Sequence, residues 1–451
     1  MRSHTRYVIS LVAALTVFSL YTIVSNKPVA NNQVEPTEST IGYDESEEAR
    51  FLEQDVSLEQ EEPRRSAPPS PTEAALSSDQ AHLKDLIHLS GRVEKFDFQT
   101  CAMRNCIDLS RCGTNLRVHI VASPMRRDSN SLNMSGESNI IHENIIKIIR
   151  ESVYFEPDPA KACILVPADD TLDRDPLSTS FRPYFQDLFQ RTHNFGMNYL
   201  IFNLYSGSWP DYRENDFSGY KIGAAILAKA SNSVAYHRKD FDISIPLFSY
   251  LHPVYDSTTS QADSLDESNQ NKTYFLTFKG KRYVIGSGSE TRNSLYHLNN
   301  QRDVIMLTTC KHGKKWRDVN DARCSEDEAD YGRYDFVDLM KRSTFCLTPR
   351  GRRLGSFRFL EALRYGCIPV ILSDGWVWPF DEIIDWSHSA LHYDEDQILL
   401  VPDMLRDISP RQIEKMRNNS KRLYRKYFSS LQKIVLTTLA IIEQRVKDNY
   451  Q

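Results

Sequence analysis

Five arginines and two glycines lie in the stretch PRGRRLGSFRFLEALR (349–364), with a single acidic residue, Glu361, among them. The pattern predicts a strand that ends at Pro349, a glycine loop, and a helix from Ser356 to Tyr365. Where a strand leads through glycines into a helix, unpaired amides and the helix dipole point at an anion, and arginines add charge-assisted bonds. The stretch therefore predicts a diphosphate site. A solvated basic face is the alternative by pattern alone.

Arg358 lies in the otherwise apolar part of that helix, three residues before Glu361 and on the same face. Burying an unpaired charge is costly, which argues against a merely solvated face. We predict that Arg358 is catalytic and stabilises charge on a leaving phosphate. The spacing fits neither the G-x-x-x-x-G-K-[ST] loop nor the G-x-G-x-x-G dinucleotide motif.

A second basic group follows a predicted strand in FKGKRY (278–283), with Lys279, Lys281 and Arg282 beside Tyr283. Arg292 follows ten residues after Arg282. Lysine and arginine at a strand end could neutralise a diphosphate. A solvated strand end is again the alternative.

Asp173 and Asp175 form an Asp-x-Asp pattern in LDRD (172–175). They could hold a divalent metal, but such sites need more oxygen ligands, so no metal is expected there. One of them could contact an acceptor, or be the catalytic base that takes its proton. Capping of the turn before Pro176 is equally compatible with the pattern.

Short apolar runs that alternate with helical patterns predict an α/β architecture with parallel sheets. Helices are expected at 139–155 and 337–343, besides the helix that carries Arg358. The polar stretch 252–272 separates two domains, predicted at 92–265 and 266–451. Strands are expected at 162–169, 198–204, 241–247, 274–280, 303–310, 343–349 and 367–373.

The N-terminal sequence predicts that the chain is anchored in a membrane. Residues 1–6 read as a cytosolic tail, and the uncharged run 7–24 as a transmembrane signal anchor, with a cleaved signal peptide as the alternative. Residues 25–91 have the composition of a disordered stem. Residues 35–62 of the stem carry a local net charge of −10, so the rest of the chain is basic by about five charges and favours anionic partners.

All eight cysteines follow the stem, and an even number suits an oxidising compartment. The spacing argues against a zinc site, since no C-x2-C pair or suitably placed histidine is present. Three glycosylation sequons, at Asn133, Asn271 and Asn418, matter only in the secretory pathway.

Several motifs together resemble the exostosin family: PRGRRLGSFRFLEAL, FNLYSGSWPDY (202–212), DTLDRD (170–175), FKGKRYVIGSGSETRN (278–293) and MLTTCKHG (306–313). The resemblance runs from about residue 96 to about 447. It implies a GT-B fold, in which two Rossmann-like domains face a cleft. It also implies an inverting glycosyltransferase that adds glucuronic acid from UDP-glucuronate to heparan sulfate, in a type II protein of the Golgi membrane and endoplasmic reticulum.

The resemblance also suggests roles for single residues. Tyr331 would stack on uracil, and Glu361 would accept from ribose hydroxyls. No cofactor is expected for donor binding, and Mn²⁺ would at most stimulate turnover. No nucleic acid partner is expected. The residues expected to bind the donor are Lys279, Lys281, Arg282, Tyr283, Arg292, Tyr331, Arg350, Arg352, Arg358 and Glu361.

Eight cysteines allow 105 pairings, so sequence alone does not fix the connectivity. Local pairing is the simplest arrangement, and the family resemblance supports it. The expected disulfides are Cys101–Cys106, Cys112–Cys163, Cys310–Cys324 and Cys346–Cys367.

Family members usually carry a second, C-terminal GT-A domain for the N-acetylglucosamine step, whereas this sequence stops at Gln451. The chain is therefore expected to work with a second exostosin-like subunit as a heterodimer. A glycosidase is a rival hypothesis, but the arginine-rich site favours an activated donor. A non-catalytic subunit that stabilises a polymerase is the other alternative.

Overall fold

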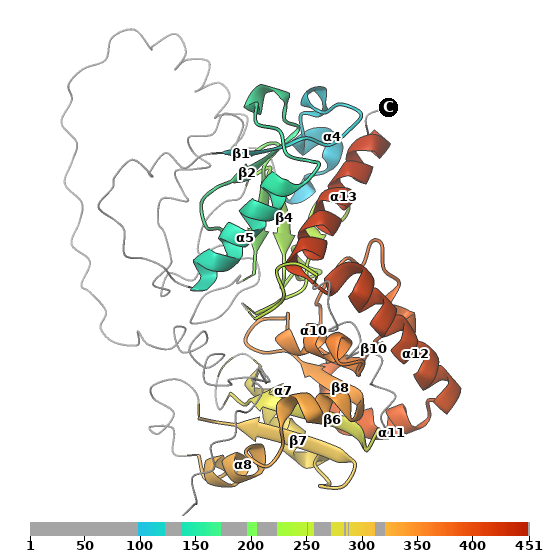
Figure 1. The fold of residues 1–451 in the computed structure, drawn as a ribbon. Coiled ribbons are helices and arrows are strands. Elements are labelled where there is room, and N and C mark those ends of the chain that lie inside the picture. Colours follow the sequence, from blue (N-terminus) through green and yellow to red (C-terminus); the bar gives the residue numbers. More distant parts are fainter. Residues whose placement is uncertain are drawn as a thin grey trace, which may run out of the picture. The chain divides into compact units, whose positions relative to one another are not determined.

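The computed structural model describes residues 98–121, 137–172, 196–204, 223–249, 251–256, 272–283, 286, 288–311 and 321–449 (Figure 1). The tail, anchor and stem expected at 1–91 lie outside these residues. No helix within the described ranges is both long and apolar enough to cross a bilayer.

The first half of the described chain contains five short parallel strands. β1 pairs with β2, and β4 pairs with both β3 and β5. A parallel bridge between Leu165 and Tyr199 joins the two sets in the order β1-β2-β3-β4-β5. The runs at 162–169, 198–204 and 241–247 form strands as predicted, whereas β1 and β4 were not predicted. The strands are β1 (Val118–Val121), β2 (Ile164–Pro167), β3 (Leu200–Asn203), β4 (Ile226–Lys229) and β5 (Ile243–Ser244).

The second half contains a five-stranded parallel sheet in the order β10-β9-β8-β6-β7. Each of the four predicted strands of this half is present. They were readable because strands covered on both faces are nearly continuous apolar runs. The short edge strand β10 was not predicted. The strands are β6 (Tyr274–Lys281), β7 (Val304–Thr309), β8 (Ser343–Pro349), β9 (Ile368–Leu372) and β10 (Leu391–His392).

The helices are α4 (Met103–Cys106), α5 (Glu137–Glu151), α7 (Ser289–Ser294), α8 (Cys324–Tyr331), α9 (Phe336–Lys341), α10 (Phe357–Arg364), α11 (Val401–Arg406), α12 (Pro410–Leu423) and α13 (Leu431–Asn449). Single 3₁₀ turns lie at Phe98–Thr100, Leu109–Arg111, Pro159–Lys161, Leu295–Leu298, Trp386–His388 and Glu395–Leu400. A π-helical turn at Tyr424–Phe428 continues α12.

The helix that carries Arg358 forms for local reasons. α10 begins after Ser356, whose backbone is extended, and buries Phe359, Leu360 and Leu363 along its apolar side. It ends before Gly366, which adopts a left-handed backbone conformation (φ 61°) that favours glycine. The next strand, β9, starts two residues later. This strand–loop–helix–strand unit agrees with the sequence prediction.

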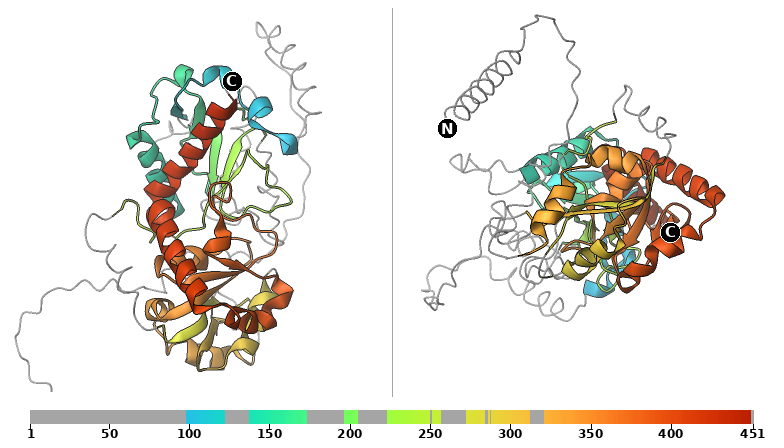
Figure 2. Two further views of the ribbon diagram at one scale, coloured as in Figure 1. Left: turned by 90° about the vertical axis from the view of Figure 1, so that its right-hand side faces the viewer. Right: turned by 90° about the horizontal axis from the view of Figure 1, so that it is seen from below.

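The last helix returns to the first half of the chain. α13 packs against α5 and α4, and its Ile434, Leu439 and Ile442 share one hydrophobic core with β1 to β5 (Figures 1 and 2). Arg445 donates from Nη1 to the carbonyl of Phe241 at 2.6 Å and pairs with Glu382 at 2.8 Å. The predicted domain limits at 265/266 stay a prediction. The closing helix contacts the half that precedes them.

Four disulfides join the eight cysteines: Cys101–Cys106, Cys112–Cys163, Cys310–Cys324 and Cys346–Cys367. These are the pairs expected from local pairing. Cys346–Cys367 links β8 to the turn before β9, on either side of the arginine-rich loop and its helix. This disulfide therefore joins the two ends of the segment that contains the predicted diphosphate site.

Candidate active site

The carboxyl ends of the parallel strands β6 and β8 bring the two basic motifs to one edge of the sheet. β6 pairs with β8, so residues that follow Lys281 and Pro349 leave the sheet in the same direction. Arg350 donates its amide to the carbonyl of Leu372 at the end of β9, 2.8 Å away. Ligands of open parallel sheets bind at this edge.

Arg358 occupies the centre of this edge. Its Nε donates to the carbonyl of Lys279 at 2.8 Å, and its Nη1 bonds to Glu361. The guanidinium lies 4.5 Å from the ring centroid of Phe336, and its side chain is only 12% exposed. Arg358 and Glu361 thus form a nearly buried pair that joins α10 to the end of β6. The shared face predicted from their spacing is confirmed.

Lys279, whose carbonyl accepts from Arg358, directs its own side chain toward Tyr331 and Tyr334. Its Nζ donates to the carbonyl of Tyr334 at 2.8 Å and lies 4.3 Å from the ring centroid of Tyr331. The side chain is almost fully buried. Lys279 therefore brings positive charge under the Tyr331 ring, at the end of α8. Stacking of this ring on a uracil stays a prediction.

Arg292 fastens the arginine loop to β6. Its Nη1 donates to the carbonyl of Lys281 at 2.7 Å, and its Nε to the carbonyl of Arg350 at 2.9 Å. The guanidinium also lies 5.0 Å from the ring centroid of Tyr283. Arg292 is buried, and its guanidinium is bonded to two backbone carbonyls. Its position fits a residue that holds the loop in place.

The loop passes close to the backbone at the start of α7 and to the side chain of Tyr283. Gly288 has a left-handed backbone (φ 73°), and a Cβ there would lie 2.1 Å from the carbonyl oxygen of Gly351. The Arg352 guanidinium lies 5.1 Å from the Tyr283 ring centroid. Gly288 and Gly351 therefore let the loop and the start of α7 approach each other, which any side chain at Gly288 would prevent.

Arg282 does not join this group. It is buried, and its guanidinium pairs with Asp321 at 2.6 Å and Asp327 at 2.7 Å. Its Nη1 also donates to Asn293 at 3.3 Å. Adjacent in sequence to Lys281, Arg282 is bonded instead to α8 and the segment before it. A buried arginine held between two carboxylates in this way fits a structural role.

The first half of the chain contacts the same loop. The amide of Gly355 donates to Ser231 Oγ at 3.0 Å, just after β4, and Trp376 Nε1 donates to the carbonyl of Ala230 at 3.1 Å. A Cβ at Gly355 would lie 2.8 Å from that carbonyl oxygen. Position 355 therefore requires glycine, because the loop backbone passes so close to the carbonyl of Ala230. The segment that follows β4 therefore contacts the loop that follows β8. The two-domain GT-B arrangement stays a prediction.

Several predicted residues are not placed. Asp173 and Asp175, and the sequons at Asn133 and Asn271, lie outside the described residues. Just before them, Asp170 accepts the amide of Leu172 at 2.9 Å, and Thr171 donates to the carbonyl of Phe202. Asn418 is described and lies exposed on α12.

Glu395 is a site residue that the sequence motifs did not indicate. Its Oε1 lies 3.8 Å from Arg350 Nη1 and accepts the amide of Asp374 at 3.0 Å. Its Oε2 accepts the hydroxyl of Thr291 at the start of α7. Glu395 therefore ties the arginine loop to the end of β9. The only sequence signal was the acidic run after β10, which is also typical of an exposed turn.

The arrangement concentrates cations and loop amides at one sheet edge, where the carboxylates of Glu361 and Glu395 each lie beside an arginine. Within the loop, Arg350 and Arg352 are partly exposed, whereas Arg353 is buried. Such a site can bind a diphosphate and stabilise the charge that develops when it leaves.

Comparison with known proteins identifies the family. The model of the "Exostosin GT47 domain" family matches residues 112–408. Exostosin-1 of Drosophila melanogaster is 48% identical over 351 residues, which are 77% of this chain and 45% of that protein. Exostosin-1b of Danio rerio is 45% identical over 371 residues, which are 80% of this chain and 48% of that protein. The chain spans about half the length of these relatives.

A solved glycosyltransferase from Rickettsia africae is 10% identical, with a TM-score of 0.38 over 74% of this chain and 99% of that chain. At that TM-score the likeness adds nothing to the fold defined by the strands. The family match covers every described residue of the basic edge, from Lys279 to Glu395. The chain therefore belongs to the exostosin GT47 family of glycosyltransferases.

Proposed function

We propose that this chain transfers glucuronic acid from UDP-glucuronate to an N-acetylglucosamine at the end of a growing heparan sulfate chain. The observation that carries the proposal is Arg358, held nearly buried at the carboxyl end of β6 by Lys279 and Glu361. A guanidinium fixed in this way, in a family of glycosyltransferases, is suited to a leaving nucleoside diphosphate. Its relatives in the exostosin family support the choice of substrates.

The transfer itself is a displacement at the anomeric carbon. A hydroxyl oxygen of the acceptor forms the new bond, the bond from the sugar to UDP breaks, and the electron pair leaves with the diphosphate. Arg358, Arg350 and the loop amides would stabilise the departing charge. The acceptor proton would go to a carboxylate, for which Asp173 and Asp175 remain the proposed residues.

We also propose that the domain works in the Golgi lumen, anchored by residues 7–24 and paired with a second exostosin-like subunit. The four disulfides support an oxidising compartment. Asn418 is exposed and could carry a glycan, although its sequon partner Ser420 is fully buried. Glycosylation there would therefore have to precede folding.

The proposal is tested by giving the purified full chain UDP-glucuronate, UDP-N-acetylglucosamine or both, with defined oligosaccharides that end in either sugar. Mass spectrometry should show one glucuronic acid added to the N-acetylglucosamine end and no further growth. Alternating elongation without a partner would reveal a second donor site. If UDP-glucuronate neither binds nor reacts, a non-catalytic stabilising subunit would be the better description.

A further inference from the structure

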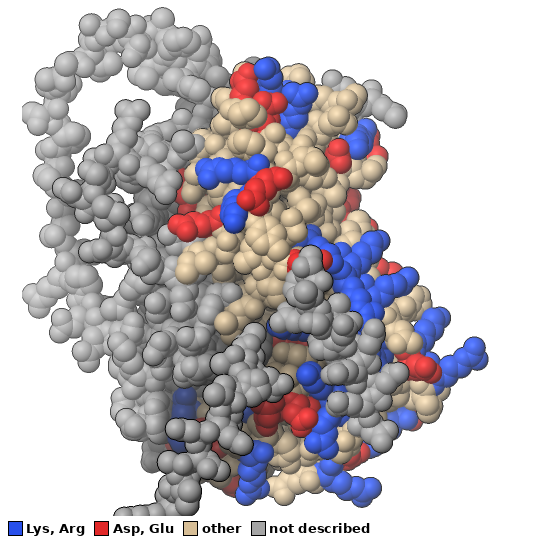
Figure 3. All heavy atoms as spheres, viewed as in Figure 1, with Lys and Arg blue, Asp and Glu red and all other residues tan. Residues whose placement is uncertain are grey.

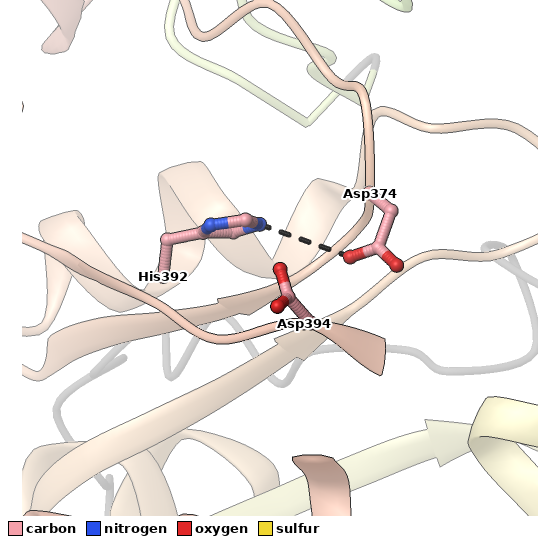
Figure 4. Close-up of side chains that lie close together, drawn as sticks. All are labelled: Asp374, His392 and Asp394. Atoms are coloured by element: carbon pink, nitrogen blue, oxygen red, sulfur yellow. Dashed lines mark ion pairs between the residues drawn. The ribbon is translucent and has the colours of Figure 1, made fainter. Parts of the chain in front are cut away.

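A second group of polar side chains lies at the same edge of the sheet, outside the arginine loop. Asp374 follows β9 by two residues, His392 ends β10, and Asp394 comes two residues later. One ligand atom from each lies within 4.8 Å of the other two (Figure 4). All three side chains are exposed, and His392 Nε2 lies 3.9 Å from Asp374 Oδ1.

This set has the donors that a first-row divalent cation uses, two carboxylate oxygens and one imidazole nitrogen. At metal–ligand distances of about 2.0–2.2 Å, neighbouring ligand atoms lie about 2.8–3.6 Å apart in octahedral or tetrahedral geometry. All three side chains are exposed, so rotations that move each ligand atom by up to about 1 Å would bring the atoms into that range. Figure 4 shows them pointing toward one another.

The group is also held in register by its neighbours. Glu395 donates its amide to Asp374 Oδ1 at 3.1 Å, while its own carboxylate accepts the amide of Asp374 at 3.0 Å. The Gln397 side chain accepts the amide of Asp394 at 3.4 Å. The His392 ring packs edge-on against Trp378, with centroids 6.0 Å apart. The ligands therefore come from two adjacent parallel strands whose ends are fixed to each other.

We propose that Asp374, His392 and Asp394 bind one divalent transition-metal ion, such as Mn²⁺ or Zn²⁺, at the rim of the donor site. Glu395, which is hydrogen-bonded to Asp374, also lies beside Arg350. Glu395 therefore connects the metal ligand Asp374 to the arginine loop. Metal binding at this site does not depend on the proposed sugar transfer.

The test uses the full chain, stripped of metal with EDTA, and Mn²⁺ alone as the probe. Electron paramagnetic resonance of free Mn²⁺ gives the number of bound ions. A triple variant, Asp374→Asn, His392→Gln and Asp394→Asn, removes the site. The matched control is Asp385→Asn with His388→Gln, an exposed Asp–His pair 3.6 Å apart with no third ligand within the described residues.

The wild type and the control should bind one more ion than the triple variant. Pulsed resonance of the bound Mn²⁺ should show coupling to an imidazole ¹⁴N that is lost in His392→Gln alone. Equal ion counts in all three proteins, or no nitrogen coupling in the wild type with either Mn²⁺ or a Co²⁺ substitute, would refute the site. Both readouts are independent of transferase activity, so they separate this proposal from the proposed function.

Discussion

Two basic segments of the chain differ in where the backbone places their side chains. The segment 349–364 carries five arginines, and Arg411 to Lys426 carries seven lysines or arginines with one acid. The first follows a parallel strand end and includes Arg358, nearly buried and bonded to backbone carbonyl and carboxylate. The second lies along α12 and its continuation, where Figure 3 shows basic side chains gathered on the surface.

The comparison shows that charge density alone does not mark a site. Arg411 and Lys415 are exposed on α12, and no carboxylate lies within 4.0 Å of either among the described residues. Water can solvate them at little cost. Arg358 gives up most of its water and is compensated by fixed partners. We expect function to depend on basic side chains that are buried and bonded to fixed partners, as Arg358 is. Four predictions test this difference.

The largest effect is expected for Arg358→Ala. Removing the fixed guanidinium should lower the transfer rate by about 100-fold or more, since such donors stabilise charge in the transition state. Because Glu361 would lose its buried partner, thermal unfolding must be measured with the rate. Arg358→Lys, which keeps the charge, should unfold near the wild-type temperature and still be slow. Activity within twofold of wild type in a folded Arg358→Ala variant would remove Arg358 from the site.

Gly288→Ala should come next. Its backbone is left-handed, and the added Cβ would meet the Gly351 carbonyl oxygen at 2.1 Å. We expect a loss of about 2 kcal/mol or more in the free energy of unfolding, with weaker UDP binding as the loop is displaced. Denaturant unfolding and calorimetric UDP titration measure the two effects. Gly113→Ala, where no atom lies within 4 Å of the new Cβ, is the matched control.

A smaller effect concerns Lys272, beneath α12. Burial, and then the nearby Arg417 and Lys421, lower the pKa of Lys272 from 10.5 to about 7. Between these values the unfolded chain holds a proton that the folded chain has lost, so the free energy of unfolding should rise from about pH 7 to 10.5. Below about pH 7 this contribution is constant. Denaturant midpoints between pH 7 and 9.5 should rise in the wild type.

The variant Lys272→Met should reduce that slope. Lys433→Met, which removes a partly exposed lysine paired with Asp256, is the comparison and should leave it unchanged. A slope of the same size in all three proteins would mean that Lys272 keeps its proton in the folded state.

The smallest effect is expected for Arg411→Ala with Lys415→Ala on α12. Both side chains are exposed, so the free energy of unfolding should change by no more than about 0.5 kcal/mol. Transfer to short acceptors should stay within twofold of wild type. A loss comparable to that of Arg358→Ala would show that α12 also binds substrate, and the contrast between the two segments would fail.

The sequence by itself determined four of the five strands of the second sheet, all but β10, and the strand–loop–helix unit that carries Arg358. Their apolar runs, the glycines and the end of α10 at Gly366 are local signals, and they hold whatever lies elsewhere in the chain. The pairing of Arg358 with Glu361 was also readable, because three residues along a helix share a face. The family itself was recognised from the same motifs.

Only the tertiary structure decided where neighbouring basic residues are bonded. Lys279 and Arg282 are three residues apart, yet one lies under Tyr331 and the other is buried against Asp321 and Asp327. Likewise, Glu395 and Asp374 reach the arginine loop through a sheet edge that joins β9 and β10. Such partners lie more than 20 residues apart and leave no periodic pattern in the sequence, because strand order and loop path, not sequence spacing, set which side chains meet.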